Sequence, residues 1–140
     1  MSAPDTSLDQ AFRETGYQVQ LPAQPLTIHI DQRQPALDAW LSQQGLPSRW
    51  SLITACNPGA RRLADADNQQ RQQALQAALD GIGWRWYPSL AVDPAGKWPD
   101  EPGAWIAGMD EDAGRIVAAT WEQLALVCRD AAGFARLVYL

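Results

Sequence analysis

Apolar and polar residues alternate over several short stretches of the chain, and this pattern predicts β-strands. The clearest example is residues 26–31, in which Leu26, Ile28 and Ile30 would share one face of a strand. Residues 50–56 are apolar on both faces, which indicates a central strand that is covered on both sides. The same criteria predict strands at 17–21, 84–92, 104–109, 124–128 and 134–140.

Helical periodicity separates several of these strands. A short helix is predicted within residues 7–15, a second over 35–44, a third over about 65–82 and a fourth from Asp110 to about 121. Asp110 is a favourable N-cap for the fourth helix, because its carboxylate can accept a hydrogen bond from a free backbone N–H. The apolar stripes place Leu75, Leu79 and Ile82 on the buried face of the third helix and Ile116 on that of the fourth.

The order of these elements predicts an α+β or mixed α/β fold. We expect one mixed sheet of about six to seven strands with about three covering helices. Residues 1–16 would form an N-terminal tail with a short helix, and residues 17–140 a single globular domain. A chain of 140 residues is long enough for one domain with a substantial core.

The composition excludes several classes of function. With 46% hydrophobic and 19% charged residues the chain is not typical of a disordered protein, and its net charge of -5 argues against binding to extended nucleic acid. One histidine and two cysteines are too few for a multi-histidine metal site or a disulfide framework, so no metal and no cofactor are predicted. The polar start of the chain and the lack of a long apolar run predict no membrane association and a cytoplasmic location.

Charge is unevenly distributed along the chain. Residues 49–71 contain four arginines and two aspartates, a net charge of +2, whereas residues 93–112 contain six acidic residues and Lys97, a net charge of -5. The basic segment could attract an anionic ligand, or its arginines could simply be solvated.

A candidate binding site lies where the central strand turns toward the third helix. Stepping back from Leu75 by four and seven residues reaches Arg71 and Asn68, so the buried face of the helix becomes polar at its start. That start should lie near Asn57, which follows the strand. Carboxamides and a guanidinium together suit a carboxylate or a phosphate. In the alternative interpretation, the asparagines only hold turns and Arg71 is paired on the surface.

The proline-rich segment between Gly96 and Pro102 is a second candidate. Trp98 and Glu101 could close over a pocket, where a desolvated carboxylate can act as a general base. Alternatively, the segment is a rigid hairpin loop whose tryptophan packs onto the sheet.

Three runs of sequence resemble an uncharacterised bacterial family of unknown function. They are WSLITACNPGARRLADADNQQRQQALQAALDGIG, GKWPDEPGAWIAGM and WEQLALV. The family carries a T-A-W-N-P turn, a Glu-Asn pair, a G-x-W-x-E-x-S loop and a late Gln-x-Ala strand. The chain departs from this pattern at Cys56, at Asp67 and at two expected serines. The resemblance implies that the following positions belong to the family pattern: Thr54, Asn57, Pro58, Asn68, Trp98, Glu101 and Gln123.

Two hypotheses about function follow from these observations. In the first, the end of the central strand binds a small polar or anionic ligand, and Glu101 is the general base if the protein is an enzyme. The ligand-binding residues would be Thr54, Asn57, Asn68, Arg71 and Trp98. In the second, the protein is a non-enzymatic interaction module that meets a partner protein through an acidic, Trp- and Pro-rich loop over residues 93–112. The oligomeric state is left open.

Overall fold

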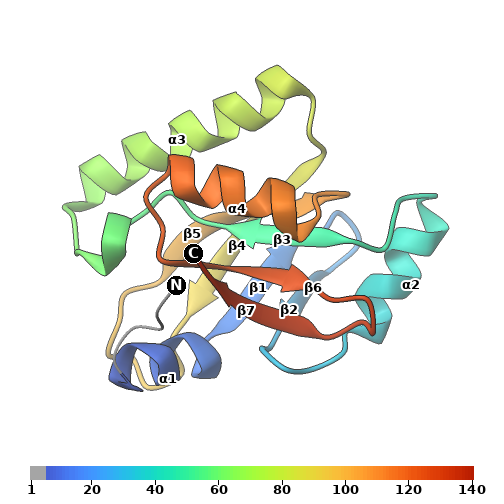
Figure 1. Cartoon of the computed structure of the whole chain (residues 1–140), viewed down its shortest axis with the longest axis horizontal. Helices are drawn as coiled ribbons and strands as arrows, with labels where there is room; N and C mark the ends of the chain where they lie inside the picture. The colour runs from blue at the N-terminus through green and yellow to red at the C-terminus, as the bar shows by residue number, and fades with distance from the viewer. Residues whose placement is uncertain (1–5) are drawn as a thin grey trace.

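The computed structural model describes residues 6–140, and within them seven strands form one hydrogen-bonded sheet (Figure 1). The first five residues of the predicted N-terminal tail lie outside the described residues. The strands lie in the order β2-β1-β4-β5-β3-β6-β7. Their bounds are β1 Gly16–Gln20, β2 Pro25–Ile28, β3 Trp50–Ile53, β4 Trp86–Val92, β5 Glu101–Ala107, β6 Ala125–Arg129 and β7 Ala135–Tyr139.

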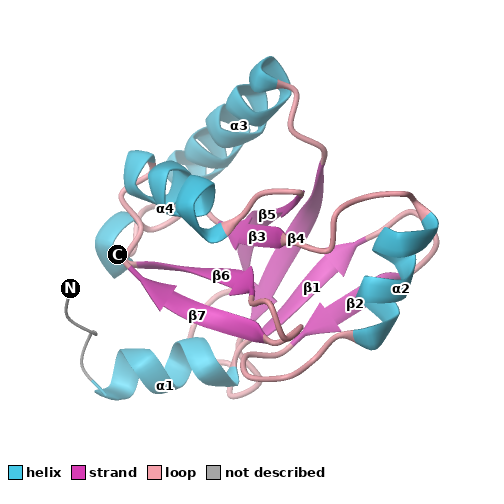
Figure 2. Ribbon diagram, turned by 45° about the vertical axis from the view of Figure 1, so that its right-hand side comes forward, coloured by secondary structure: helices cyan, strands magenta, loops and turns pink. Residues whose placement is uncertain are grey.

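Within the described part of the chain, four α-helices cover the two faces of this sheet. Their bounds are α1 Thr6–Glu14, α2 Pro35–Gln43, α3 Asp65–Ile82 and α4 Glu111–Thr120. Helices α3 and α4 lie together on one face, and α1 and α2 lie on the other side of the curled sheet (Figure 2). The fold is therefore α+β. None of the helices in residues 6–140 has the length and apolar character that crossing a bilayer requires.

Every strand pairing among the described residues is antiparallel, so the predicted mixed sheet is wrong. Alternating strands and helices suggested parallel neighbours, because a helix usually connects two parallel strands. Here β5 lies between β3 and β4, and β3 lies between β5 and β6. Helices α3 and α4 therefore each connect two strands of the same direction across an inserted antiparallel strand.

Each face of the sheet has its own hydrophobic core, because side chains alternate along the central strands. Trp50 and Leu52 of β3 pack with Trp105 of β5 and with α2, while Ile53 and Ile106 pack with α3 and α4. On the α2 side, ring centroids of Trp50 and Trp105 lie 6.1 Å apart. This double coverage is what the two-sided apolar pattern of residues 50–56 predicted.

The helix predictions hold in position but not at every buried residue. Helix α3 has the predicted bounds, and the Asp110 side chain accepts a hydrogen bond from Ala113 N at 2.9 Å, as expected of an N-cap. Ile82 and Ile116 were predicted to be buried but are 75% and 70% exposed. In α4 the buried residues are Gly114 and Ala118. Ile116 lies two residues from each, which is a rotation of about 200° around the helix axis, so its side chain faces solvent.

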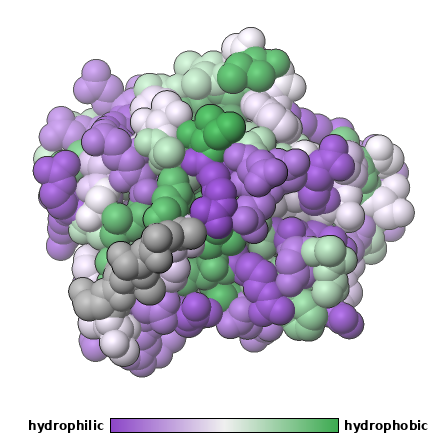
Figure 3. Space-filling view, viewed as in Figure 1, coloured by the Kyte–Doolittle hydropathy of each residue, from purple (hydrophilic) through white to green (hydrophobic). Residues whose placement is uncertain are grey.

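Apolar side chains also reach the surface. Figure 3 shows a band of apolar surface down the middle of one face of the molecule, flanked by hydrophilic side chains. Leu124 is 37% exposed, and it also lines the cavity described next.

Candidate functional site

A cavity of about 140 Å³ lies between α1 and the sheet, on the side of Leu52. This is close to the roughly 150 Å³ of an engineered protein cavity that holds benzene, so the space suits a compact ligand of about one ring. Its apolar walls come from α1 and from the sheet, and they include Leu8, Ala11, Phe12, Leu52, Ala91, Val127 and Leu137. Polar residues also line it, among them Thr54, Asn57, Ser89, Glu101 and Gln123.

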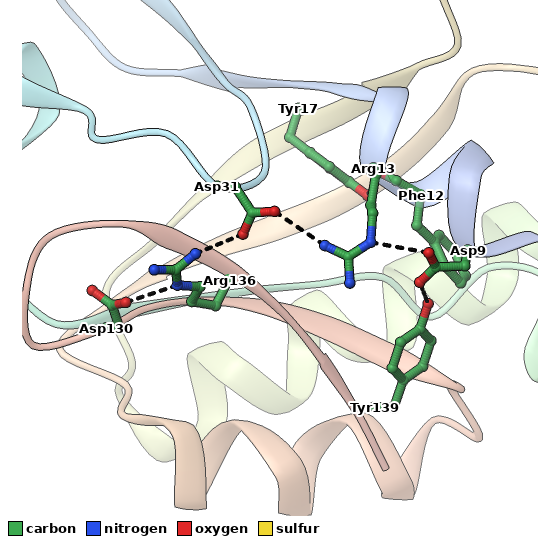
Figure 4. Close-up of polar contacts among 8 residues, drawn as sticks. All are labelled: Asp9, Phe12, Arg13, Tyr17, Asp31, Asp130, Arg136 and Tyr139. Atoms are coloured by element: carbon green, nitrogen blue, oxygen red, sulfur yellow. Dashed lines mark hydrogen bonds and ion pairs between the residues drawn. The ribbon is translucent and has the colours of Figure 1, made fainter. Parts of the chain in front are cut away.

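Helix α1 forms one wall of the cavity although none of its residues is fully buried. Polar contacts hold it in place (Figure 4). Arg13 pairs with Asp31 at 3.1 Å, and Asp9 accepts a hydrogen bond from the Tyr139 hydroxyl group. The Tyr17 hydroxyl donates to the Phe12 carbonyl oxygen at 3.1 Å. An exposed ion pair such as Arg13–Asp31 contributes only about 0–1 kcal/mol, and the Phe12 and Tyr139 rings, with centroids 6.4 Å apart, add an apolar contact.

The loop after β3 adopts an unusual backbone conformation. Asn57 has φ 48° and ψ 61°, in the left-handed region, and it is followed by a short 3₁₀ turn over Pro58–Ala60. Asparagine visits this region more readily than most residues. Ala60 also has a positive φ, of 61°, which costs an alanine about 1 kcal/mol. The loop is held by the hydrogen bond from Gly59 N to Glu122 O at 2.8 Å.

Asn57 and Asn68 form a reciprocal pair. Asn68 Oδ1 accepts from Asn57 N at 2.8 Å, and Asn68 Nδ2 donates to Asn57 Oδ1 at 2.8 Å. Leu63 N also donates to Asn57 Oδ1, at 2.9 Å. Since Asn57 Oδ1 receives two donors, the orientation of the amide is determined, and its Nδ2 faces Glu101 Oε2 at 2.9 Å. The polar start of α3 thus meets the end of β3, as the helical spacing predicted.

Glu101 is a partly buried carboxyl group at the start of β5, where it pairs with Ala91 of β4. Burial raises its pKa, and the hydrogen bond from Asn57 opposes that shift. The Thr54 hydroxyl carries one proton, which it donates to Pro102 O at 2.7 Å. Among residues 6–140, no Lys, Arg or His forms an ion pair with Glu101. Asn57 Nδ2 donates to this carboxyl group at 2.9 Å, and the Thr54 hydroxyl lies close enough to lower its pKa as well.

Arg71 lies outside the lining of the cavity. Its Nε donates to Ala55 O at 2.6 Å, its Nη2 donates to Trp121 O at 2.7 Å, and its Nη1 lies 3.5 Å from Glu122 Oε1. All three guanidinium nitrogens are thus used to join the end of β3 to the turn after α4. The contacts give Arg71 a structural role, and its predicted role in ligand binding stays a prediction.

Trp98 lies at the edge of the cavity and is 46% exposed. The turn that carries it is built on Asp93, whose carboxylate accepts from the backbone N–H groups of Ala95, Lys97 and Trp98 at 2.9, 2.9 and 3.1 Å. Residues 93–100 form a loop, and β5 begins at Glu101, three residues before the strand predicted at 104–109, so the acidic segment 93–112 of the interaction hypothesis is not one loop. Strand β5 occupies the middle of that segment and separates its two acidic ends by about 23 Å.

Of the predicted site residues, four line the cavity: Thr54, Asn57, Trp98 and Glu101. Asn68 is not part of the cavity lining, and it holds Asn57 through two hydrogen bonds. Three further lining residues, Thr15, Tyr17 and Ser89, were not predicted, and Gln123 was predicted only through the family resemblance. A signal for Ser89 exists, because it lies between Tyr87 and Ala91, which share its face of β4 and pack against the core. Tyr17 was taken only as a strand residue.

Cys56 lies next to this site but is buried and unpaired. Its sulfur lies 3.6 Å from Pro102 O and 3.8 Å from Asn68 O. Burial raises the pKa of the thiol, which disfavours the nucleophilic thiolate. The arrangement therefore does not favour Cys56 as a nucleophile.

Comparison with known proteins places this site in a family. No curated protein and no solved structure matches the chain. Residues 53–126, more than half of the chain, match the model of a family described as a protein of unknown function, DUF3293. The matched segment contains Asn57, Asn68 and Glu101, while α1 and β7 lie outside it. The chain belongs to the DUF3293 family of proteins of unknown function.

Proposed function

We propose that the cavity between α1 and the sheet binds a small molecule and that Glu101 is the group that recognises it or exchanges a proton with it. A mostly apolar pocket with a few convergent polar groups is the usual form of a small-molecule site. The observation that carries the proposal is the position of Glu101 in such a cavity. Asn57 holds this carboxyl group there, and no basic side chain among residues 6–140 forms an ion pair with it.

The chemistry of Glu101 suits proton transfer. Burial raises the pKa of this carboxyl group, which brings it closer to the range in which a general acid or base works at neutral pH. If a bound ligand undergoes reaction, Glu101 is the group placed to accept or return the proton. Asn57 would act as a positioning residue, because its amide orients the carboxyl group.

The ligand is polar at one end. The sequence analysis also allowed an anionic ligand, and that part of the hypothesis relied on Arg71, whose guanidinium is committed to other groups. The interaction-module hypothesis rests now on Trp98 alone, since β5 divides the acidic segment. It stays a prediction, which loss of a captured partner on Trp98→Ala would support.

A titration with benzyl alcohol, followed by amide chemical shifts, tests the binding proposal. This probe combines one aromatic ring with one hydroxyl group. Saturable shifts confined to residues around the cavity are expected. Ala91→Leu, which fills the cavity, should abolish them, whereas Ala77→Leu on the exposed face of α3 should not. Absence of saturable binding of benzyl alcohol and of its amine and carboxylate analogues by the unmodified protein would overturn the proposal.

A further inference from the structure

Several polar groups around the cavity use their hydrogens on the protein itself, whereas the Ser89 hydroxyl can donate as well as accept. The Thr15 hydroxyl donates to Ala11 O at 2.6 Å, and the Tyr17 hydroxyl donates to Phe12 O at 3.1 Å. Thr54 donates in the same way to a backbone carbonyl, that of Pro102. A hydroxyl group has one hydrogen and two lone pairs, so these three side chains can only accept hydrogen bonds from a ligand. One lone pair of Thr54 Oγ1 already accepts from Cys56 N at 3.0 Å, which leaves the other.

The Gln123 side chain follows the same rule. Its Nε2 donates to Cys56 O at 3.1 Å and to Trp121 O at 3.1 Å, which uses both amide hydrogens. The oxygen of this carboxamide is left as an acceptor. Asn57 Nδ2 directs one hydrogen to Glu101, and Asn57 Oδ1 is occupied.

The charged side chains of the cavity lining also favour a ligand that donates hydrogen bonds. Three ionisable side chains besides Tyr17 line the cavity, namely Glu101, Asp93 and Arg62. The Asp93 carboxylate is occupied by backbone N–H groups of its own turn, and Arg62 belongs to an exposed position of the loop before α3. Glu101 is thus the more buried of the two charged groups, Glu101 and Arg62, that remain available to a ligand. A buried carboxylate is costly unless a cation or hydrogen-bond donors compensate it.

We propose that the ligand is a compact amine, with a protonated nitrogen on an apolar body of about one ring. This inference rests on the proposed function and names its ligand class. An ammonium group supplies up to three donors and a positive charge, which matches a cavity that offers one carboxylate and several acceptors. The apolar body would lie against Leu52 and Phe12.

The aromatic wall supports the same class of ligand. Phe12 and Trp98 line the cavity, and a cation near the face of an aromatic ring is attracted to it. An anionic ligand would instead face the Glu101 carboxylate, with Arg62 as its compensating charge at an exposed position.

Three probes of matched shape test the inference, namely benzylamine, benzyl alcohol and benzoate, titrated at pH 7 and followed by amide shifts. Benzylamine should bind at least about tenfold more tightly than benzyl alcohol, and benzoate should bind most weakly. Glu101→Gln should remove the preference for the amine, because the variant keeps the acceptor for Asn57 and loses the charge. Asp100→Asn removes the same charge from an exposed neighbouring position and should leave the preference intact.

The outcomes separate the two proposals. If benzyl alcohol binds as tightly as benzylamine, or more tightly, the amine inference is overturned and the binding proposal stands. Tight binding of benzoate that is lost in Arg62→Ala overturns the amine inference in favour of an anionic ligand. An amine preference that survives Glu101→Gln overturns the role of Glu101. Failure of all three probes to bind overturns both proposals.

Discussion

Asn68→Ala tests directly whether the candidate site is held in one geometry by its carboxamide pair. Asn68 accepts a hydrogen bond from Asn57 N and donates one to Asn57 Oδ1, both at 2.8 Å. Truncation to alanine removes both bonds and leaves the backbone N–H of Asn57 without its acceptor. The orientation of the Asn57 amide toward Glu101 would then depend on Leu63 N alone.

The expected loss of stability follows from these contacts. Two hydrogen bonds at about 0.5–1.5 kcal/mol each give a loss of about 1–3 kcal/mol, and alanine recovers roughly 0.5–0.7 kcal/mol through its higher helix propensity. The net decrease in the free energy of unfolding is therefore about 1.5 kcal/mol. With an unfolding entropy of about 2.1 cal/mol/K per residue, this lowers the Tm by about 5 °C for a chain of 140 residues.

Thermal and urea unfolding of the two proteins, followed by circular dichroism, measures this difference. Gln70→Ala is the matched control, because it lies on the exposed face of α3 and changes helix propensity alone. A second readout is the affinity for benzyl alcohol, which should fall when the Asn57 amide is released. If Asn68→Ala is as stable as Gln70→Ala, the reciprocal pair does not hold the loop and the reasoning is refuted.

Three further predictions concern Glu101, the helix glycines and α1. Burial raises the folded-state pKa of Glu101 above the unfolded value near 4.5, so its stabilising contribution is present below that value and lost as pH rises through the folded-state pKa. Urea denaturation at several pH values should therefore show Glu101→Gln gaining stability relative to the native chain as pH rises. Gly114→Ala would place a Cβ 2.6 Å from Ser51 Oγ, and this overpacking should lower the free energy of unfolding by about 1–3 kcal/mol. In Gly81→Ala the Cβ meets open space, and the free energy of unfolding, measured by thermal unfolding, should rise by about 0.5–1 kcal/mol. Arg13→Ala removes the ion pair to the sheet side and should speed amide exchange in α1 while changing global stability by less than about 1 kcal/mol.

Each of these predictions has a result that would contradict it. A stability difference between Glu101→Gln and the native chain that is independent of pH would mean that burial does not shift the carboxyl pKa. Equal Tm values for Gly114→Ala and Gly81→Ala would mean that α4 can move away from β3. Unchanged amide exchange in Arg13→Ala would mean that apolar contacts, rather than polar ones, hold α1.

Local elements were predictable because their signals are contained in short stretches of sequence. The bounds of α3 and the Asp110 N-cap follow from helical periodicity and capping preference. The proximity of Asn57 and Asn68 was also predictable. A short loop joins the end of the strand to the helix, and helical spacing places Asn68 on the face of the helix that packs against the sheet. Strand β5 was predicted to begin three residues later than it does, because Glu101 becomes part of it by pairing with Ala91. That pairing is not visible in the composition of the proline-rich segment.

The sequence by itself determined the kinds of element, their order and the absence of a histidine- or cysteine-rich site chemistry. The tertiary structure decided the antiparallel order of the sheet, because an inserted strand can occupy the gap between two helix-connected strands without changing any local pattern. It also decided that Arg71 bonds to carbonyl groups outside the cavity and that α1 encloses the cavity. These features depend on contacts between segments far apart in the chain, and local periodicity carries no information about such contacts.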